Sequence, residues 1–162
     1  HVAQEEKNAS IRGMHILIAE DNELNMEIAQ FVLESAGAVL SRAMNGKEAL
    51  ECFQASAPGT FDVILMDVMM PAMDGFEATR AIRALDREDA KTIPIIAMTA
   101  NAFAEDRKRA FEAGMNEHLA KPLESRQMKE VIAAYRGKKV QADSTAQPGS
   151  EVQPDGGTGS EK

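Results

Sequence analysis

Several features that would assign this chain to a common class of protein are missing from it. Its single cysteine, Cys52, excludes an internal disulfide and lies in a helical pattern, where we expect an inert, packed thiol. No apolar run approaches the roughly 20 residues of a membrane span, and no signal peptide is visible. The net charge of −8 lacks the basic excess of nucleic-acid-binding proteins. We therefore expect a cytoplasmic protein that contacts neither nucleic acid nor membrane through this part of its chain.

Apolar residues are also scarce at the two ends of the chain. Residues 1–13 are polar with little periodicity, so we interpret them as a linker. Residues 137–162 contain no Leu, Ile, Met or aromatic residue, but five Gly and two Pro, a composition that cannot offset the entropy of ordering. We predict a disordered tail or linker there, and one domain over residues 14–136. Because the chain opens on His1 rather than Met, we expect a fragment of a longer protein.

Between these ends, short apolar runs alternate with helical patterns. The apolar runs predict five strands, at residues 14–19, 39–43, 63–66, 93–98 and 117–120. A helix is expected after each strand, and the first helix carries Leu24, Ile28, Phe31 and Val32 on one face. Asp74, with Glu77 three residues later, predicts the start of the third helix. The charged run 86–89 is expected to be a solvated loop.

This alternation predicts the fold class. Five strands that alternate with five helices favour an α/β, flavodoxin-like (βα)5 doubly wound fold. The sheet should be parallel, with five strands in the order 2-1-3-4-5, and ligands should bind at the carboxyl ends of strands 1 and 3.

Polar side chains follow four of the five predicted strands. Glu20 and Asp21 come after the first strand, Asp67 after the third, Thr99 after the fourth and Lys121 after the fifth. The carboxyl ends of parallel strands meet at one edge, and three carboxylates there repel one another unless a cation joins them. Hard oxygen ligands suit Mg²⁺, while a hydroxyl and an ammonium suit a phosphoryl group. The sequence therefore predicts a site for phosphoryl transfer.

These residues lie in motifs that together resemble those of response-regulator receiver domains. The resemblance spans about residues 14–136. Its motifs are Glu20-Asp21-Asn22, then Asp67 followed by Met70-Pro71-Ala72-Met73-Asp74-Gly75, then Met98-Thr99-Ala100, and finally Lys121-Pro122.

The resemblance implies a metal site. Asp67 would be the residue phosphorylated from a phosphohistidine, and it would ligate Mg²⁺ directly together with Asp21. The backbone carbonyl of Met69 would be a third protein ligand, and Glu20 would act through a water molecule.

The resemblance also implies roles for the remaining polar residues. Lys121 and Thr99 would each contact the phosphoryl group, and the Lys121-Pro122 peptide bond is commonly cis in this family. His118 stands where many members have a switch Tyr or Phe, so it could swing inward behind Thr99. A histidine could also respond to pH at this position.

Further motifs are similar to those of receivers fused to hybrid sensor histidine kinases: residues 12–13, 19–25, 99–102 and 114–118. The expected partners are a histidine kinase, a histidine phosphotransfer domain, or both. The fragment would then belong to the cytoplasmic part of a sensor kinase, which can itself be membrane-bound. The receiver would catalyse only its own phosphorylation and dephosphorylation, whereas a parent kinase would be an enzyme.

Two other functions are open to this sequence. A stand-alone, single-domain response regulator acting by protein–protein contacts would carry the same motifs. An aspartate-nucleophile phosphatase on a related sheet would need a second acid two residues after Asp67, where Met69 stands. The phosphatase is therefore the less favoured of the two.

Overall fold

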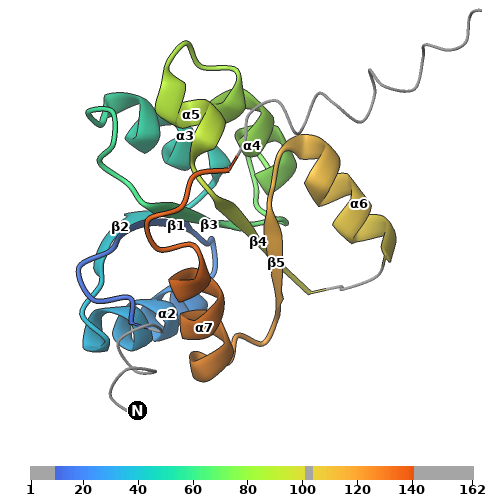
Figure 1. Ribbon diagram of the computed structural model, residues 1–162. Helices are drawn as coiled ribbons and strands as arrows, with labels where there is room; N and C mark the ends of the chain where they lie inside the picture. The colour runs from blue at the N-terminus through green and yellow to red at the C-terminus, as the bar shows by residue number, and fades with distance from the viewer. Residues whose placement is uncertain (1–9, 101–103, 141–162) are drawn as a thin grey trace, which may run out of the picture.

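The protein forms one parallel five-stranded sheet covered by helices on both faces (Figure 1). The computed structural model describes residues 10–100 and 104–140. The strand order is β2-β1-β3-β4-β5, as the sequence predicts for a flavodoxin-like fold. The strands are β1 (His15–Ala19), β2 (Val39–Ala43), β3 (Val63–Asp67), β4 (Ile95–Thr99) and β5 (Glu117–Ala120).

The helices divide between the two faces of the sheet. α2 (Glu23–Ser35) and α7 (Ser125–Ala134) lie below the sheet in the view of Figure 1. The other face is covered by α3 (Gly46–Ala55), α4 (Gly75–Arg83), α5 (Glu88–Thr92) and α6 (Ala104–Ala113). Among the described residues no helix is both long and apolar enough to cross a membrane.

β3 is the central strand and the main support of the core. All five of its residues are buried, and so are all five of β4. Alternate side chains enter the two separate core clusters: Ile64 packs with Phe53 on the α3 side, and Leu65 packs with Met128 on the α7 side. Each fully buried aliphatic side chain contributes about 1.5–3 kcal/mol. A nearly continuous apolar run is therefore the expected sequence for this position.

Side-chain caps begin three helices close to the carboxyl edge of the sheet. Asp74 accepts a hydrogen bond from the Glu77 amide at 2.8 Å, and the Glu77 carboxylate accepts one from the Asp74 amide at 3.1 Å. This capping box confirms the predicted start of α4. The side chains of Asn22 and Asn45 cap α2 and α3 by accepting from the amides of Asn25 and Glu48.

Most of the predicted apolar face of α2 points away from the sheet, and of its four residues Val32 packs against the core. Leu24, Ile28 and Phe31 are 65%, 47% and 74% exposed. The helix packs instead through Met26, Ala29 and Leu33, all fully buried. Both sets of residues follow the helical period, so α2 has two apolar faces, and the prediction chose the outer one.

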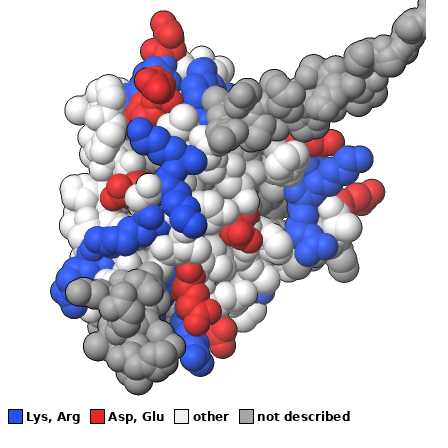
Figure 2. Space-filling model, in the orientation of Figure 1, with Lys and Arg blue, Asp and Glu red and all other residues white. Residues whose placement is uncertain are grey.

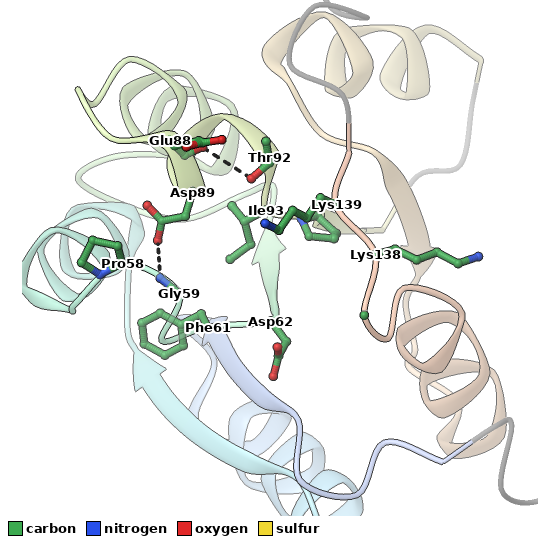
Figure 3. A pocket seen from close by; sticks show the side chains of 12 residues that line it. Pro58, Gly59, Phe61, Asp62, Glu88, Asp89, Thr92, Ile93, Lys138 and Lys139 are labelled. Carbon is green, nitrogen blue, oxygen red and sulfur yellow. Dashed lines mark hydrogen bonds between the residues drawn. The ribbon is translucent and has the colours of Figure 1, made fainter.

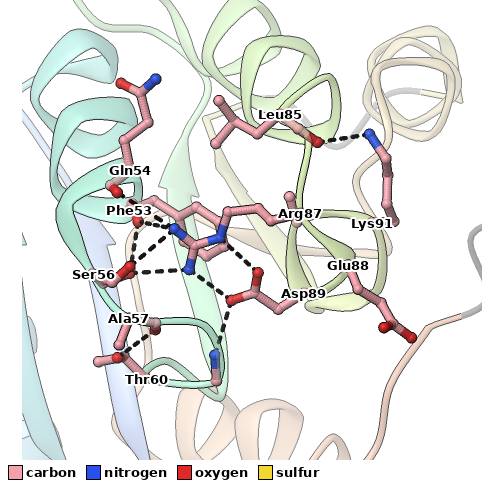
Figure 4. A network of polar contacts seen from close by, with 12 residues as sticks. Phe53, Gln54, Ser56, Ala57, Thr60, Leu85, Arg87, Glu88, Asp89 and Lys91 are labelled. Carbon is pink, nitrogen blue, oxygen red and sulfur yellow. Dashed lines mark hydrogen bonds and ion pairs between the residues drawn. The ribbon is translucent and has the colours of Figure 1, made fainter.

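The prediction of a loop at 86–89 was wrong, because α5 begins within this charged run (Figure 4). The Arg87 guanidinium stacks 4.5 Å above the Phe53 ring and donates to the carbonyls of Phe53 and Ser56 at 3.1 and 2.9 Å. Asp89 holds the other side of the guanidinium, with hydrogen bonds of 2.7 and 2.9 Å. Arg87 therefore adds donors to carbonyls at the C-terminal end of α3, where the Phe53 carbonyl also accepts from the Ser56 amide.

The described chain extends slightly beyond the predicted domain at both ends. Ile11, in the predicted linker 1–13, is 1% exposed and belongs to the core, while residues 1–9 lie outside the described part. Arg136 donates to the carbonyl of Arg12 at 2.9 Å and joins the two ends of the domain. Figure 2 shows Lys and Arg side chains gathered in a band across this face.

The residues after α7 cross the amino edge of the sheet. The Val140 amide donates to the carbonyl of Thr92 at 2.8 Å. Lys138 and Lys139 line one side of an open pocket of about 380 Å³, with Phe61 and Ile93 on its other walls (Figure 3). The predicted tail beyond residue 140 lies outside the described residues.

Candidate functional site

Three carboxylates from two adjacent strands meet at the carboxyl edge of the sheet. Glu20 and Asp21 follow β1, and Asp67 ends β3. One oxygen from each lies within 4.8 Å of the others. Glu20 and Asp67 are only 1% and 3% exposed, whereas Asp21 is exposed. The predicted acidic cluster is therefore present, with two acids buried and one at the surface.

A single ammonium group lies among these acids. Lys121, directly after β5, places its Nζ 3.0 Å from Glu20 Oε1 and 3.0 Å from Asp67 Oδ2. The Lys121-Pro122 peptide bond is cis, as the family resemblance implies. One lysine against three carboxylates leaves the cluster with an excess of negative charge.

Burial disfavours the charged forms of both Asp67 and Lys121, so it acts on their pKa values in opposite directions. Desolvation raises the pKa of Asp67 to about 6, and the nearby Glu20 adds to this effect, while the Lys121 hydrogen bond opposes it. Burial disfavours the charged form of Lys121, but its hydrogen bonds to Asp67 and Glu20 outweigh that effect and raise its pKa. Lys121 therefore stays charged, and Asp67 is mostly ionised at neutral pH.

Backbone amides complete the hydrogen bonding of the buried acids. The Met69 amide donates to Asp67 Oδ1 at 3.3 Å, and the Asn22 amide donates to Glu20 Oε2 at 3.1 Å. The Met69 side chain itself is 74% exposed. Each carboxylate thus has one oxygen facing Lys121 and the other facing a backbone amide.

Thr99 and His118 occupy different surroundings. Thr99 ends β4, is 7% exposed, and accepts a hydrogen bond at its carbonyl from the Lys121 amide at 2.8 Å. His118 lies in β5 and lines a small pocket beside α6, with Arg107 and Phe111. The structure therefore brings Thr99 to the strand edge with Lys121, while His118 pairs in register with Ala97, two residues before Thr99. A role for His118 as the switch stays a prediction, and residues 101–103 lie outside the described part.

Two glycines near the acids were not recognised as site residues from the sequence. A Cβ on Gly75 would lie 2.2 Å from the Asp67 carbonyl oxygen, so only glycine lets α4 begin against the strand end. A Cβ on Gly46 would lie 2.3 Å from the carbonyl oxygen of Met73. The available signal was that α3 and α4 both begin with glycine, a poor helix former.

The donor set fits a hard divalent cation. All three side chains offer carboxylate oxygens, and repulsion between them falls when a cation joins them. Mg²⁺ typically takes one or two carboxylates and keeps several waters, which an exposed Asp21 beside a buried Asp67 would allow. The cluster can therefore hold a metal ion next to the buried Asp67 carboxylate and the Lys121 ammonium group.

Sequence comparison matches most of the chain to a known family. The model of the response regulator receiver domain family matches residues 16–133. The sensor protein GacS of Pseudomonas syringae pv. syringae is 38% identical over 129 residues, which cover 79% of this chain. The chain spans only 14% of the length of that relative.

Solved structures support the same relationship. The receiver domain of the sensor histidine kinase PA1611 from Pseudomonas aeruginosa PAO1 has been solved with a magnesium ion in its active site cleft. Its match to this chain has a TM-score of 0.70 and 36% identity, over 78% of this chain and 99% of that one. The receiver domain of Ssk1 from Saccharomyces cerevisiae has been solved together with the histidine phosphotransfer protein Ypd1. The match to this co-crystal structure has a TM-score of 0.68 and 26% identity, over 76% of this chain and 89% of that one.

Proposed function

Because this chain belongs to the response regulator receiver domain family, we propose that it is the phosphoacceptor of a two-component phosphorelay, with Asp67 accepting a phosphoryl group from a phosphohistidine. The observation that carries this proposal is the buried Asp67 carboxylate, which lies 3.0 Å from Lys121 and in one cluster with Glu20 and Asp21.

Asp67 is the nucleophile of the proposed reaction. One carboxylate oxygen attacks phosphorus while the bond from phosphorus to the imidazole nitrogen breaks, and the electron pair returns to that nitrogen. A new phosphorus–oxygen bond forms an aspartyl phosphate. Because burial raises the pKa of Asp67 only to about 6, the nucleophile is mostly ionised at neutral pH.

Lys121 and Thr99 would hold the incoming group. The Lys121 ammonium already lies between Glu20 and Asp67, so a short movement would let it pair with a phosphoryl oxygen. The Thr99 hydroxyl would donate a hydrogen bond to another oxygen of the same group. Both residues come from strand ends, so the sheet fixes their positions before the donor arrives.

Asp21, Asp67 and the Met69 carbonyl would hold Mg²⁺, and Glu20 would act through water. When bound, the ion neutralises charge on the phosphoryl oxygens. The exposed Asp21 is the ligand that can be removed without disturbing the buried pair. Asp21→Asn should therefore weaken Mg²⁺ binding, measured by chemical-shift titration, by about tenfold. Unchanged binding in this variant would place the metal elsewhere.

The phosphohistidine donor must dock beside Asp67, because that side chain is recessed. The exposed apolar face of α2 is suited to this contact, since α2 begins two residues after Asp21 and presents Leu24 and Ile28 to solvent. We assign this face to a helical histidine phosphotransfer domain or to the equivalent helices of a histidine kinase. This partner would bury apolar surface that is otherwise exposed.

The docking assignment has a test that separates binding from chemistry. The double variant Leu24→Ser, Ile28→Ser should slow phosphorylation by a protein donor at least tenfold, but leave phosphorylation by a small phosphodonor unchanged. Phe111→Ser, at another exposed apolar residue on α6, is the matched control and should slow neither reaction. Equal slowing with both donors would overturn the assignment.

The parent protein is proposed to be a hybrid sensor histidine kinase, with this domain on the cytoplasmic side. Curated relatives such as GacS are sensor kinases much longer than this chain, which supports a hybrid kinase over a stand-alone regulator. Detection of a kinase domain in the same polypeptide would test this directly.

The acceptor itself is tested by phosphorylation of the full chain. A small phosphodonor with Mg²⁺ should add one phosphoryl group, which peptide mapping should locate on Asp67. Asp67→Asn should show none, and Asp62→Asn, at an exposed acid just before β3, should behave as the wild type. Phosphorylation of Asp67→Asn at the wild-type rate would overturn the proposal.

A further inference from the structure

Gly46 lies at the start of α3, on the opposite side of the reaction site from Lys121. It follows the N-cap Asn45, is buried, and is the first residue of its helix. Its backbone is not in the left-handed region, so conformation alone does not require glycine there. Alanine would be the better helix former at such a position. The need for glycine must therefore come from its surroundings.

Those surroundings are the loop that connects Asp67 to α4. The Gly46 amide donates to the carbonyl of Met73 at 3.1 Å. A Cβ on Gly46 would lie 2.3 Å from the same carbonyl oxygen and 3.0 Å from the Cβ of Ala78. The first contact is with backbone, which cannot rotate away as a flexible side chain could. Any side chain at position 46 must therefore displace the loop.

The loop itself is short and held at both of its ends. The Val68 amide donates to the Met98 carbonyl at 3.0 Å, and the Gly75 amide donates to the Val68 carbonyl at 2.9 Å. Its turn is tight, with a hydrogen bond of 2.7 Å from the Met73 amide to Pro71 and a positive φ of 68° at Ala72. Because the loop is held in this way, a displacement of Met73 should also displace Met69.

Met69 is the point at which this loop touches the reaction site. Its amide donates to Asp67 Oδ1 at 3.3 Å, and its carbonyl is the proposed third ligand of Mg²⁺. We propose that Gly46 is a positioning residue for this site: the close approach of its backbone to Met73 fixes the 68–74 loop and thereby the Met69 backbone. The part of this inference that concerns Mg²⁺ rests on the proposed function.

The first test is Mg²⁺ titration of Gly46→Ala in the full chain, followed by amide chemical shifts. We expect the Mg²⁺ dissociation constant to rise about tenfold, as is typical when a group supporting a ligand is lost. We also expect the Met69 amide resonance to shift before any Mg²⁺ is added. Ser125→Ala, at the exposed first position of α7, is the matched control and should change neither quantity.

A second measurement uses the wild-type protein and does not depend on the variant folding. If the Gly46 contact positions the ligands, thermodynamic reciprocity requires that filling the site stabilise the contact. Saturating Mg²⁺ should therefore slow hydrogen exchange of the Gly46 amide in the wild-type protein by about tenfold. Exchange at the Gly13 amide, bonded to Gly37 at the other edge, should change far less.

The outcomes separate this inference from the function on which it rests. Wild-type protein that does not respond to Mg²⁺ at all would overturn both. Wild-type protein that binds Mg²⁺, with Gly46→Ala binding equally well, would overturn the positioning role alone. If hydrogen exchange of the Gly46 amide is the same with the site empty and filled, the positioning role is also overturned, whether or not the variant folds.

Discussion

The charged side chains at the carboxyl edge of the sheet and those around the covering helices have different kinds of partner. At the carboxyl edge, Lys121 pairs with Glu20 and Asp67, and Asp21 lies in the same acidic cluster. On the α3–α6 side, the partly buried Arg83 and Arg87 donate to several neutral backbone carbonyls, and Arg87 also pairs with Asp89. Arg83 donates to Ala90 at 3.0 Å and to Gly114 at 2.8 Å, and Arg87 donates to carbonyls at the end of α3.

The difference separates groups that hold the fold from groups that await a ligand. Burial lowers the pKa of Arg83 to about 10, so it remains charged at neutral pH while its donors are filled by carbonyls that helix ends leave free. At Asp67 burial raises the pKa to about 6, which records a charge that the native state holds at a cost. Both shifts record a cost of burying a charge, but the Arg83 guanidinium is bonded to two carbonyls and the Asn116 side chain, whereas the Asp67 carboxylate lies beside other carboxylates.

The largest expected effect tests the contribution of the arginines to stability. Arg83→Met should lower the free energy of unfolding by about 3 kcal/mol, because the carbonyls of Ala90 and Gly114 and the Asn116 side chain lose their donor. Urea denaturation measures the change, with Arg80→Met on the exposed face of the same helix as control. A loss equal to that of the control would show that the buried guanidinium contributes nothing.

The second effect is the pH dependence of stability that arises from Asp67. The folded pKa of Asp67 is about 6 and its ordinary value is 3.8, so between these values the native state binds more protons than the unfolded state. The contribution of Asp67 to stability is therefore fully present below this window and is lost as pH rises through it. Without divalent cations, wild type should lose roughly 2 kcal/mol relative to Asp67→Asn over this range.

That difference is read from urea denaturation of both proteins at several pH values. Subtracting the variant removes the titration of all other acids, so the remaining slope belongs to Asp67. A difference that is flat, or that favours wild type as pH rises, would mean that the carboxylate is not destabilising in the native state.

The sequence predicts the carboxyl edge well because its chemistry depends on strand ends. Asp67 directly follows an apolar run and Lys121 follows a short strand, and parallel topology brings both to one edge. Sequence patterns do not show which of two apolar helix faces packs against the sheet. Two helical stripes on α2 are apolar, and nothing in their spacing says that Met26 rather than Ile28 faces the sheet.

The arginine contacts are invisible in the sequence for a different reason. Besides Asp89, the partners of Arg87 are carbonyls of Phe53 and Ser56, which every residue type possesses, so no side-chain pattern marks its contact with α3. The charged run 86–89 therefore predicted a solvated loop, although α5 begins within it. Close backbone approach, as at Gly46, is likewise marked only by a glycine where a better helix former would be expected.

The smallest expected effect concerns the lifetime of the phosphoryl group. Met69 is exposed beside Asp67 and offers no strong hydrogen bond to orient an attacking water. Met69→Asn should supply one and speed hydrolysis a few-fold, less than about 1 kcal/mol in the barrier. Decay is followed after phosphorylation by a small phosphodonor, with Asp67→Asn as the blank. Equal or slower decay in Met69→Asn would remove the evidence that Met69 restrains water.

The most direct test of the central claim is thermal unfolding of wild type and Asp67→Asn, with and without Mg²⁺. The excess of acid at the carboxyl edge should make wild type the less stable protein without Mg²⁺, since Lys121 keeps Glu20 as a partner in the variant. By binding to the native acids, as proposed, Mg²⁺ should raise the melting temperature of wild type far more than that of the variant. Wild type that is more stable without Mg²⁺, or an equal response of both proteins, would contradict the account.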